Sequence, residues 1–139
     1  MASGTHNNLA NVIINHLLRN QAFTPPATIY VALFTVLPTR STTGTEVSTS
    51  GTAYARVAVT LSAAANGLTD NSATVTWAQA TGSGFGTVVG VGFCISLAGA
   101  LSTDLWTFAN LTANQDVPAG VVFSIPANQL DWDFAATPA

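Results

Sequence analysis

Charged side chains are scarce in this sequence. Asp, Glu, Lys and Arg make up 6% of the 139 residues, whereas a soluble globular domain usually carries roughly a quarter. There is no lysine, and the only cations are Arg19, Arg40 and Arg56. Because binding a phosphate backbone requires a cluster of Lys and Arg, a chain of net charge −3 with three scattered arginines is not expected to bind nucleic acid.

Residues that bind metals or form crosslinks are equally rare. The single Cys94 cannot form an intramolecular disulfide, and its apolar neighbours Phe93 and Ile95 indicate a small buried side chain and not a reactive thiol. The spacing of the two histidines, His6 and His16, does not match a zinc motif, so ordinary polar roles are favoured. We therefore predict no cofactor and no metal.

Targeting and membrane signals are also missing. The first 21 residues have no basic segment followed by a continuous apolar core, and no apolar run approaches the roughly 20 residues that span a bilayer. We expect no membrane partner and synthesis in a cytoplasm. A surface with so few charges has little electrostatic repulsion to keep it soluble, which favours either burial in an assembly or a neutral, hydroxyl-rich virion or secreted surface.

The strongest local signal is an uncharged run that begins after the pair Pro25-Pro26. Ile29 to Phe34 are β-branched, aromatic or otherwise apolar, and the run is too short for a buried helix. Proline fixes φ and cannot continue a helix, so the pair separates this run from whatever precedes it. The pattern predicts a core strand that is buried on both faces.

One amphipathic helix is predicted over residues 7–20. Leu9, Val12, Ile13 and Leu17 recur at helical spacing, Thr5 or Asn7 can cap the start, and Asn20 before the proline pair can close it. The polar face carries uncharged amides that suit a packed, hydrogen-bonded contact. We predict a protein interface at these four residues: Asn7, Asn8, Asn11 and Asn15.

The rest of the chain is typical of β-structure. Strand-sized segments lie at 54–61, 69–77, 88–97, 105–111, 121–125 and 130–134, and Asn66-Gly67 is a strong turn signal. The Thr- and Ser-rich stretch 38–53 exceeds the usual connection length and is expected to be mobile until a neighbour orders it. The predicted fold is mainly β, an antiparallel β-sandwich (jelly-roll-like) with one N-terminal helix. We expect a single domain over 1–139, with the helix at 7–20 and the sandwich at 27–134.

Patterns that could support catalysis or ligand binding are weak. The glycine-rich stretch 82–92 lacks the Gly-Lys-Ser/Thr of a phosphate loop, and no serine nucleophile elbow is present. Asp131 and Asp133 fit a solvated strand edge better than a calcium site that another chain completes. The aromatic side chains fit the core or a subunit interface better than a sugar platform: Trp77, Phe85, Trp106 and Trp132. We expect no enzymatic activity.

Four segments carry a resemblance to a known family. LLRNQAFTPPATIYVALFT, the YAR at 54–56 with its flanks, NSATVTWAQAT with GFGTVVGVGF, and the late VPAGVVFSIPANQL resemble small virion proteins of tailed bacteriophages that are often labelled tail-fibre or structural proteins. The resemblance covers about residues 9 to 130. It implies a β-rich, non-enzymatic particle component that is made in the bacterial host cytoplasm. Residues 94–106 depart from the family pattern, which has a more polar, acidic turn there.

From these observations we expect a structural protein of a phage virion. A single domain without repeats or coiled-coil heptads favours a capsid decoration or cement protein on the particle exterior. The alternatives are a tail or tail-fibre component and a carbohydrate-binding adhesin module. The expected partners are further copies of the chain and other virion proteins such as the major capsid protein.

Overall fold

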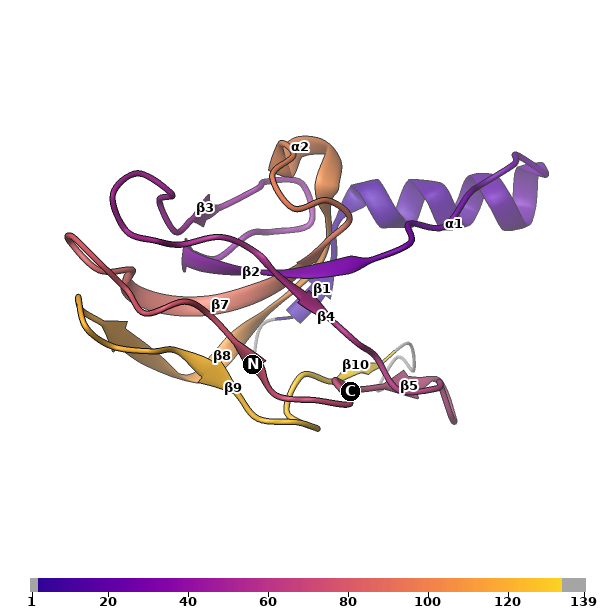
Figure 1. Cartoon of the computed structure of the whole chain (residues 1–139). Coiled ribbons are helices and arrows are strands. Elements are labelled where there is room, and N and C mark those ends of the chain that lie inside the picture. Colours follow the sequence, from indigo (N-terminus) through magenta and orange to yellow (C-terminus); the bar gives the residue numbers. More distant parts are fainter. Residues whose placement is uncertain (1–2, 134–139) are drawn as a thin grey trace.

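The main structural element is a six-stranded antiparallel sheet. The computed structural model describes residues 3–133, and the sheet has the order β1-β8-β7-β2-β3, with β4 pairing beside β3 on the outer side of β2 (Figure 1). Its strands are β1 (Ser3–Thr5), β2 (Ile29–Val36), β3 (Thr45–Glu46), β4 (Val57–Val59), β7 (Gly86–Cys94) and β8 (Leu105–Val117).

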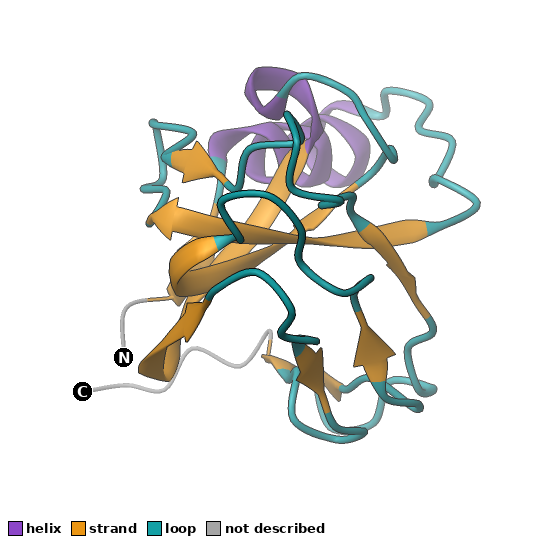
Figure 2. Ribbon diagram, turned by 60° about the vertical axis from the view of Figure 1, so that its left-hand side comes forward, coloured by secondary structure: helices purple, strands orange, loops and turns teal. Residues whose placement is uncertain are grey.

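Two short strand pairs face this sheet and form the second layer. β5 (Leu68–Thr69) pairs with β10 (Trp132–Asp133), and β6 (Val75–Thr76) pairs with β9 (Ser124–Ile125). Figure 2 shows that long loops connect these pairs. The main core lies between the layers and includes buried Trp77, Phe85 and Phe123. The predicted mainly-β, sandwich-like fold is confirmed, with a second layer made of short pairs.

Strand β2 is buried on both faces, as predicted. Val31 to Phe34 have no exposed surface. Because side chains alternate along a strand, Val31 and Leu33 enter the main core, whereas Ala32 and Phe34 pack on the other face with Cys94. On that second face the ring of Phe34 lies so close to Gly92 that a Cβ at this position would be 2.9 Å from Phe34 Cε2. The glycine inside β7 is therefore explained by close packing.

The helices lie on the side of the sheet opposite to the second layer (Figure 1). α1 (Asn7–Arg19) agrees with the predicted helix, and Asn20 closes it with φ 53° in the left-handed region. The N-cap is His6, where Thr5 or Asn7 was expected: its side chain accepts a hydrogen bond from the Asn8 backbone N–H. No helix within residues 3–133 is long and apolar enough to cross a membrane.

Several strands differ from the sequence prediction. β1, β3 and the short helix α2 (Leu101–Asp104) were not predicted, and the single strand expected over 69–77 is replaced by the separate β5 and β6. The last strand is limited to β10, and residue 134 of the predicted segment lies outside the described residues. The turn at Asn66-Gly67 is confirmed by φ values of 54° and 80°. Two-residue strands carry too little alternation to be recognised in a sequence.

The long connection 38–53 is packed against the body. Pro38, Val47 and Thr52 are buried, and the Val47 backbone N–H donates to Leu33 O at 2.9 Å. These contacts attach the stretch to the edge and interior of the main sheet, and its expected mobility in the free subunit stays a prediction.

Leu33 offers a direct test of the central strand. Leu33→Ala should lower the free energy of unfolding by roughly 2–5 kcal/mol, since it leaves a cavity in a site with no exposed surface. Val36→Ala, on the same strand but 56% exposed, is the matched control and should change stability by less than about 0.5 kcal/mol. Chemical denaturation monitored by circular dichroism gives both values, and similar effects for the two variants would show that β2 is not the core strand.

Candidate interface site

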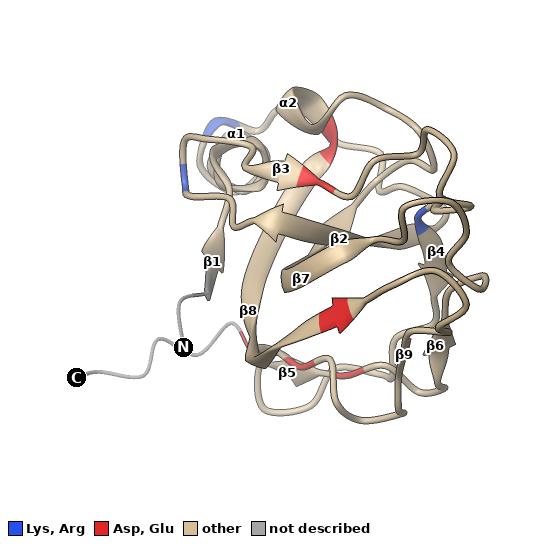
Figure 3. Cartoon of the chain, turned by 90° about the vertical axis from the view of Figure 1, so that its left-hand side faces the viewer, with Lys and Arg blue, Asp and Glu red and all other residues tan. Residues whose placement is uncertain are grey.

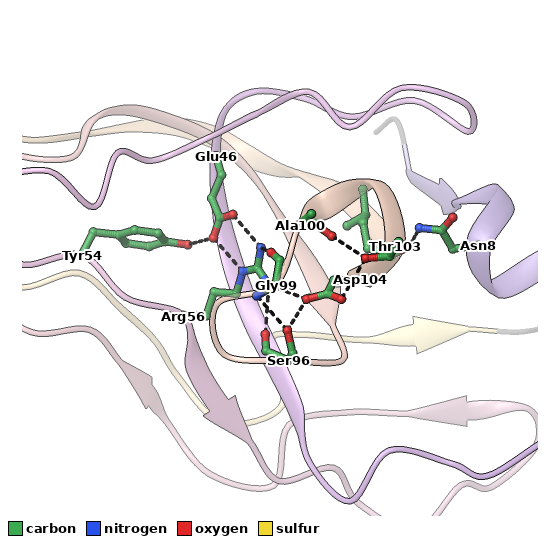
Figure 4. A network of polar contacts seen from close by, with 10 residues as sticks. Asn8, Glu46, Tyr54, Arg56, Ser96, Gly99, Ala100, Thr103 and Asp104 are labelled. Carbon is green, nitrogen blue, oxygen red and sulfur yellow. Dashed lines mark hydrogen bonds and ion pairs between the residues drawn. The ribbon is translucent and has the colours of Figure 1, made fainter.

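A buried arginine joins three separate segments of the chain. Arg56, directly before β4, is 6% exposed. Its guanidinium donates from Nε and Nη2 to the two carboxylate oxygens of Glu46 in β3, both at 2.9 Å, and from Nη1 to Asp104 Oδ2 at 3.2 Å (Figure 4). The remaining donors reach the backbone oxygens of Ser96 and Gly99, each at 2.9 Å. Arg56 thus ties β3 to α2 and to the turn before α2.

The surrounding groups complete this network. The Tyr54 hydroxyl donates to Glu46 Oε1 at 2.8 Å and accepts from the Leu33 backbone N–H at 2.9 Å. The Ser96 hydroxyl donates to Asp104 Oδ2. Each buried polar group named here has at least one partner, which is the condition under which buried charge is tolerated.

The protonation states follow from burial and charge. Burial and the Glu46 carboxylate raise the pKa of the Tyr54 phenol, so its proton stays in place. Burial alone would lower the pKa of the Arg56 guanidinium, but the hydrogen bond and charge of Glu46 and the hydrogen bond to Asp104 outweigh it and raise the pKa. The network is a fixed cation between two acids, and its role is structural.

Helix α1 is attached to this region by its first turns. The His6 backbone N–H donates to Trp106 O at 2.8 Å, and Asn8 Nδ2 donates to Leu105 O at 3.1 Å, one residue beyond α2. Leu9 is the one helix residue among Asn7–Arg19 that is buried. Burial lowers the pKa of the His6 imidazole, which favours the neutral ring that caps the helix. The first turn of α1, which we call its base, is therefore held by Leu105 and Trp106, the two residues that follow Asp104.

The opposite end of α1 extends beyond the sheet (Figure 1). Three large apolar side chains are exposed there: Ile14 by 47%, Leu17 by 70% and Leu18 by 80%. Asn11, Ile14 and Leu18 are spaced by three and four residues, which places them in one stripe, and Leu17 flanks it. Exposed leucine on a projecting helix is typical of a contact surface. We call Ile14, Leu17 and Leu18 the helix tip.

The four predicted interface asparagines occupy different environments. Asn7 Oδ1 accepts from Arg40 Nε at 3.0 Å and Asn8 contacts Leu105, so both amides are used within the chain. Asn15 Oδ1 accepts from Arg19 Nη1 at 3.0 Å. Asn11 is exposed and shares its stripe with the helix tip. The predicted interface remains a prediction, and the structure adds the exposed apolar side chains of the helix tip beside it.

A cleft opens on the side of the sheet that faces away from the helices. It has a volume of about 750 Å³ and lies between the core face of β7 and β8 and the segment that contains β9 and β10. Apolar side chains line it, including Phe93, Leu111 and Phe123; Val121 and Val122 also line it and are 39% and 52% exposed. Three carboxylates lie among its lining residues: Asp116, Asp131 and Asp133. We call this feature the acidic cleft.

The other candidates from the sequence are placed as follows. Cys94 is buried, and burial together with Glu46 and Asp104 raises the pKa of its thiol to about 12, so it is an unreactive core residue as predicted. Trp77 and Phe85 are core residues. The ring centroids of Trp106 and Phe23 are 6.0 Å apart, and Trp132 lines the acidic cleft. Residues 3–133 contain no group of three or more His, Cys, Asp and Glu side chains that could hold a metal ion.

Nearly the whole described chain matches one protein family. A family profile described as podophage GP4 fiber I protein gp80 matches residues 4–133. The match extends from β1 to β10 and thus includes the helix tip, the Arg56 network and the acidic cleft. No curated protein matches the chain. The resemblance to phage virion structural proteins, drawn above from shorter segments, is confirmed.

The Arg56 network predicts a large loss of stability on substitution. Arg56→Met leaves two carboxylates without their cation and should lower the free energy of unfolding by about 3–5 kcal/mol. Arg40→Met, at an exposed arginine, should cost less than about 0.5 kcal/mol. Adding Glu46→Gln and Asp104→Asn to Arg56→Met removes the unpaired charges and should recover more than about 1 kcal/mol. Denaturant titration of the wild type, the two single variants and the triple variant measures these free energies of unfolding. Equal losses for Arg56→Met and Arg40→Met would show that the Arg56 network does not stabilise the fold.

Proposed function

The chain belongs to the podophage GP4 fiber I protein gp80 family, and on that premise we propose that it is a non-enzymatic structural subunit of the fibre apparatus of the virion. The family match covers nearly the whole described fold, so it concerns the complete architecture and not a short shared motif. The charged side chains that are buried are engaged in the Arg56 network, which supports a structural use of the interior.

The observation that carries this proposal beyond the family is the helix tip. A solvated helix end does not favour leucines that are 70% and 80% exposed, whereas a subunit contact covers them. We propose that the outward stripe of α1, with Asn11 beside Ile14 and Leu18, is buried against another virion subunit. A fibre position is preferred to the capsid decoration favoured by the sequence alone, because the family description names a fibre protein.

The position in the particle can be observed directly. Antibodies raised against the purified chain, with gold conjugates, should label the tail and fibre region of intact virions. Label distributed over the head exterior would support a decoration protein and reject the fibre assignment. Particles that lack the gene product provide the negative control for antibody specificity.

Incorporation of helix variants into virions tests the interface. Asn11→Asp and Asn15→Asp should each reduce the copy number per particle, because a negative charge in a contact of apolar and amide groups loses its solvation on assembly. Ala78→Asp, at an exposed position in the second layer, is the matched control and should be incorporated normally. Gel densitometry of purified particles gives the copy number, and circular dichroism of each free variant establishes that it folds. Full incorporation of both helix variants would place the interface elsewhere.

A further inference from the structure

We propose that the chain assembles head to tail, with the helix tip of one copy seated in the acidic cleft of the next copy. This inference rests on the proposed role as a fibre subunit and names the partner of the same helix. The occupant is a second copy because the two surfaces complement each other in polarity and in charge.

The helix tip combines apolar side chains with positive charge. Ile14, Leu17 and Leu18 are exposed, and Arg19 follows them directly. Arg40 lies at the other end of the same helix, where its Nε donates to Asn7 Oδ1 at 3.0 Å, about 16 Å along the helix axis from Leu18. Both arginines are exposed and available to a carboxylate from outside. Helix α1 therefore carries one positive charge beside its tip, at Arg19, and a second beside its first turn, at Arg40.

The acidic cleft has the opposite charge around an apolar interior. Asp116, Asp131 and Asp133 are exposed lining residues, and Val121 and Val122 present apolar surface between them and the core. Among residues 3–133, no arginine lines the cleft. Figure 3 shows two basic positions at α1 and the adjacent loop, a third beside β4 that belongs to the Arg56 network, and most of the acidic positions at the far end of the fold near β5 and β8.

The dimensions agree with partial insertion of a helix. Two turns of helix with side chains, about 11 Å long and 10–12 Å wide, occupy about 1,000 Å³. The cleft volume is about 750 Å³. The side chains of the last two turns of α1 can thus enter while the outer face of the helix remains at the rim, close to the carboxylates.

The positions of the two surfaces determine the kind of assembly. The helices cover one face of the six-stranded sheet, and the cleft lies on the other face, between the sheet and the second layer (Figure 1). A contact between two different surfaces is heterologous, and repetition of it produces a ring or an open filament. An open filament of this kind fits a fibre.

Charge-reversal variants test the direction of the contact. The tip variant Arg19→Glu/Arg40→Glu has acidic charge on both surfaces, and the cleft variant Asp116→Lys/Asp131→Lys has basic charge on both. Each variant alone should associate about tenfold or more weakly than the wild type, because like charges meet at the contact. An equimolar mixture should regain association, since each tip then meets a cleft of opposite charge. Sedimentation velocity across a concentration series measures all four samples.

Controls separate the proposal from general charge effects and from its own premise. The cleft variant has a net charge of −3 + 4 = +1, so repulsion from net charge does not explain a loss of association. Leu17→Ser/Leu18→Ser should abolish association, and circular dichroism should show native folds throughout. Monomeric wild-type protein at all concentrations, or a cleft variant that associates like the wild type, overturns the head-to-tail contact. Gold label on the head would reject the fibre role independently of these results.

Discussion

The pairing of Arg56 with Glu46 and Asp104 is the constraint on which the helical side of the molecule depends. These three groups account for a third of the nine charged side chains, three basic and six acidic. They come from segments that are distant in sequence. The guanidinium compensates the cost of removing each carboxylate from water. Asp104 ends α2, and Leu105 directly after it receives the Asn8 side chain of α1. The orientation of α1 is thus coupled to a buried ion pair.

Local sequence was sufficient to predict the elements that carry a continuous apolar pattern or a specific turn or stop residue. Strand β2 appears as an unbroken apolar run because both of its faces are covered, by the main core on one side and by Cys94 and Leu105 on the other. Helix α1 was recognised from its spacing and from the stop at Asn20. The turn at Asn66-Gly67 was recognised because left-handed conformations favour these two residues.

The features that sequence reasoning missed are set by contacts between distant residues. The partners of Arg56 lie 10 and 48 positions away, and no pattern links them. The four residues of α2 are too few for periodicity to be visible. On α1 the spacing of apolar residues identifies the helix, but which of its residues are covered depends on how little of the helix reaches the body. Asn8 faces inward at the base, whereas Leu17 and Leu18 face outward beyond the sheet.

The low charge content has a different meaning once its distribution is known. With the Arg56 network set aside, two arginines remain near α1, and four acids remain in the second layer, at its connections and at the end of β8. So few charges give little general repulsion between copies, and their separation to two ends makes approach of unlike ends more favourable than approach of like ends. Exposed charges act over about 8 Å at physiological ionic strength, so in the proposed head-to-tail contact this preference sets the orientation and apolar burial supplies the affinity. A sequence poor in charge can therefore still specify the polarity of an assembly.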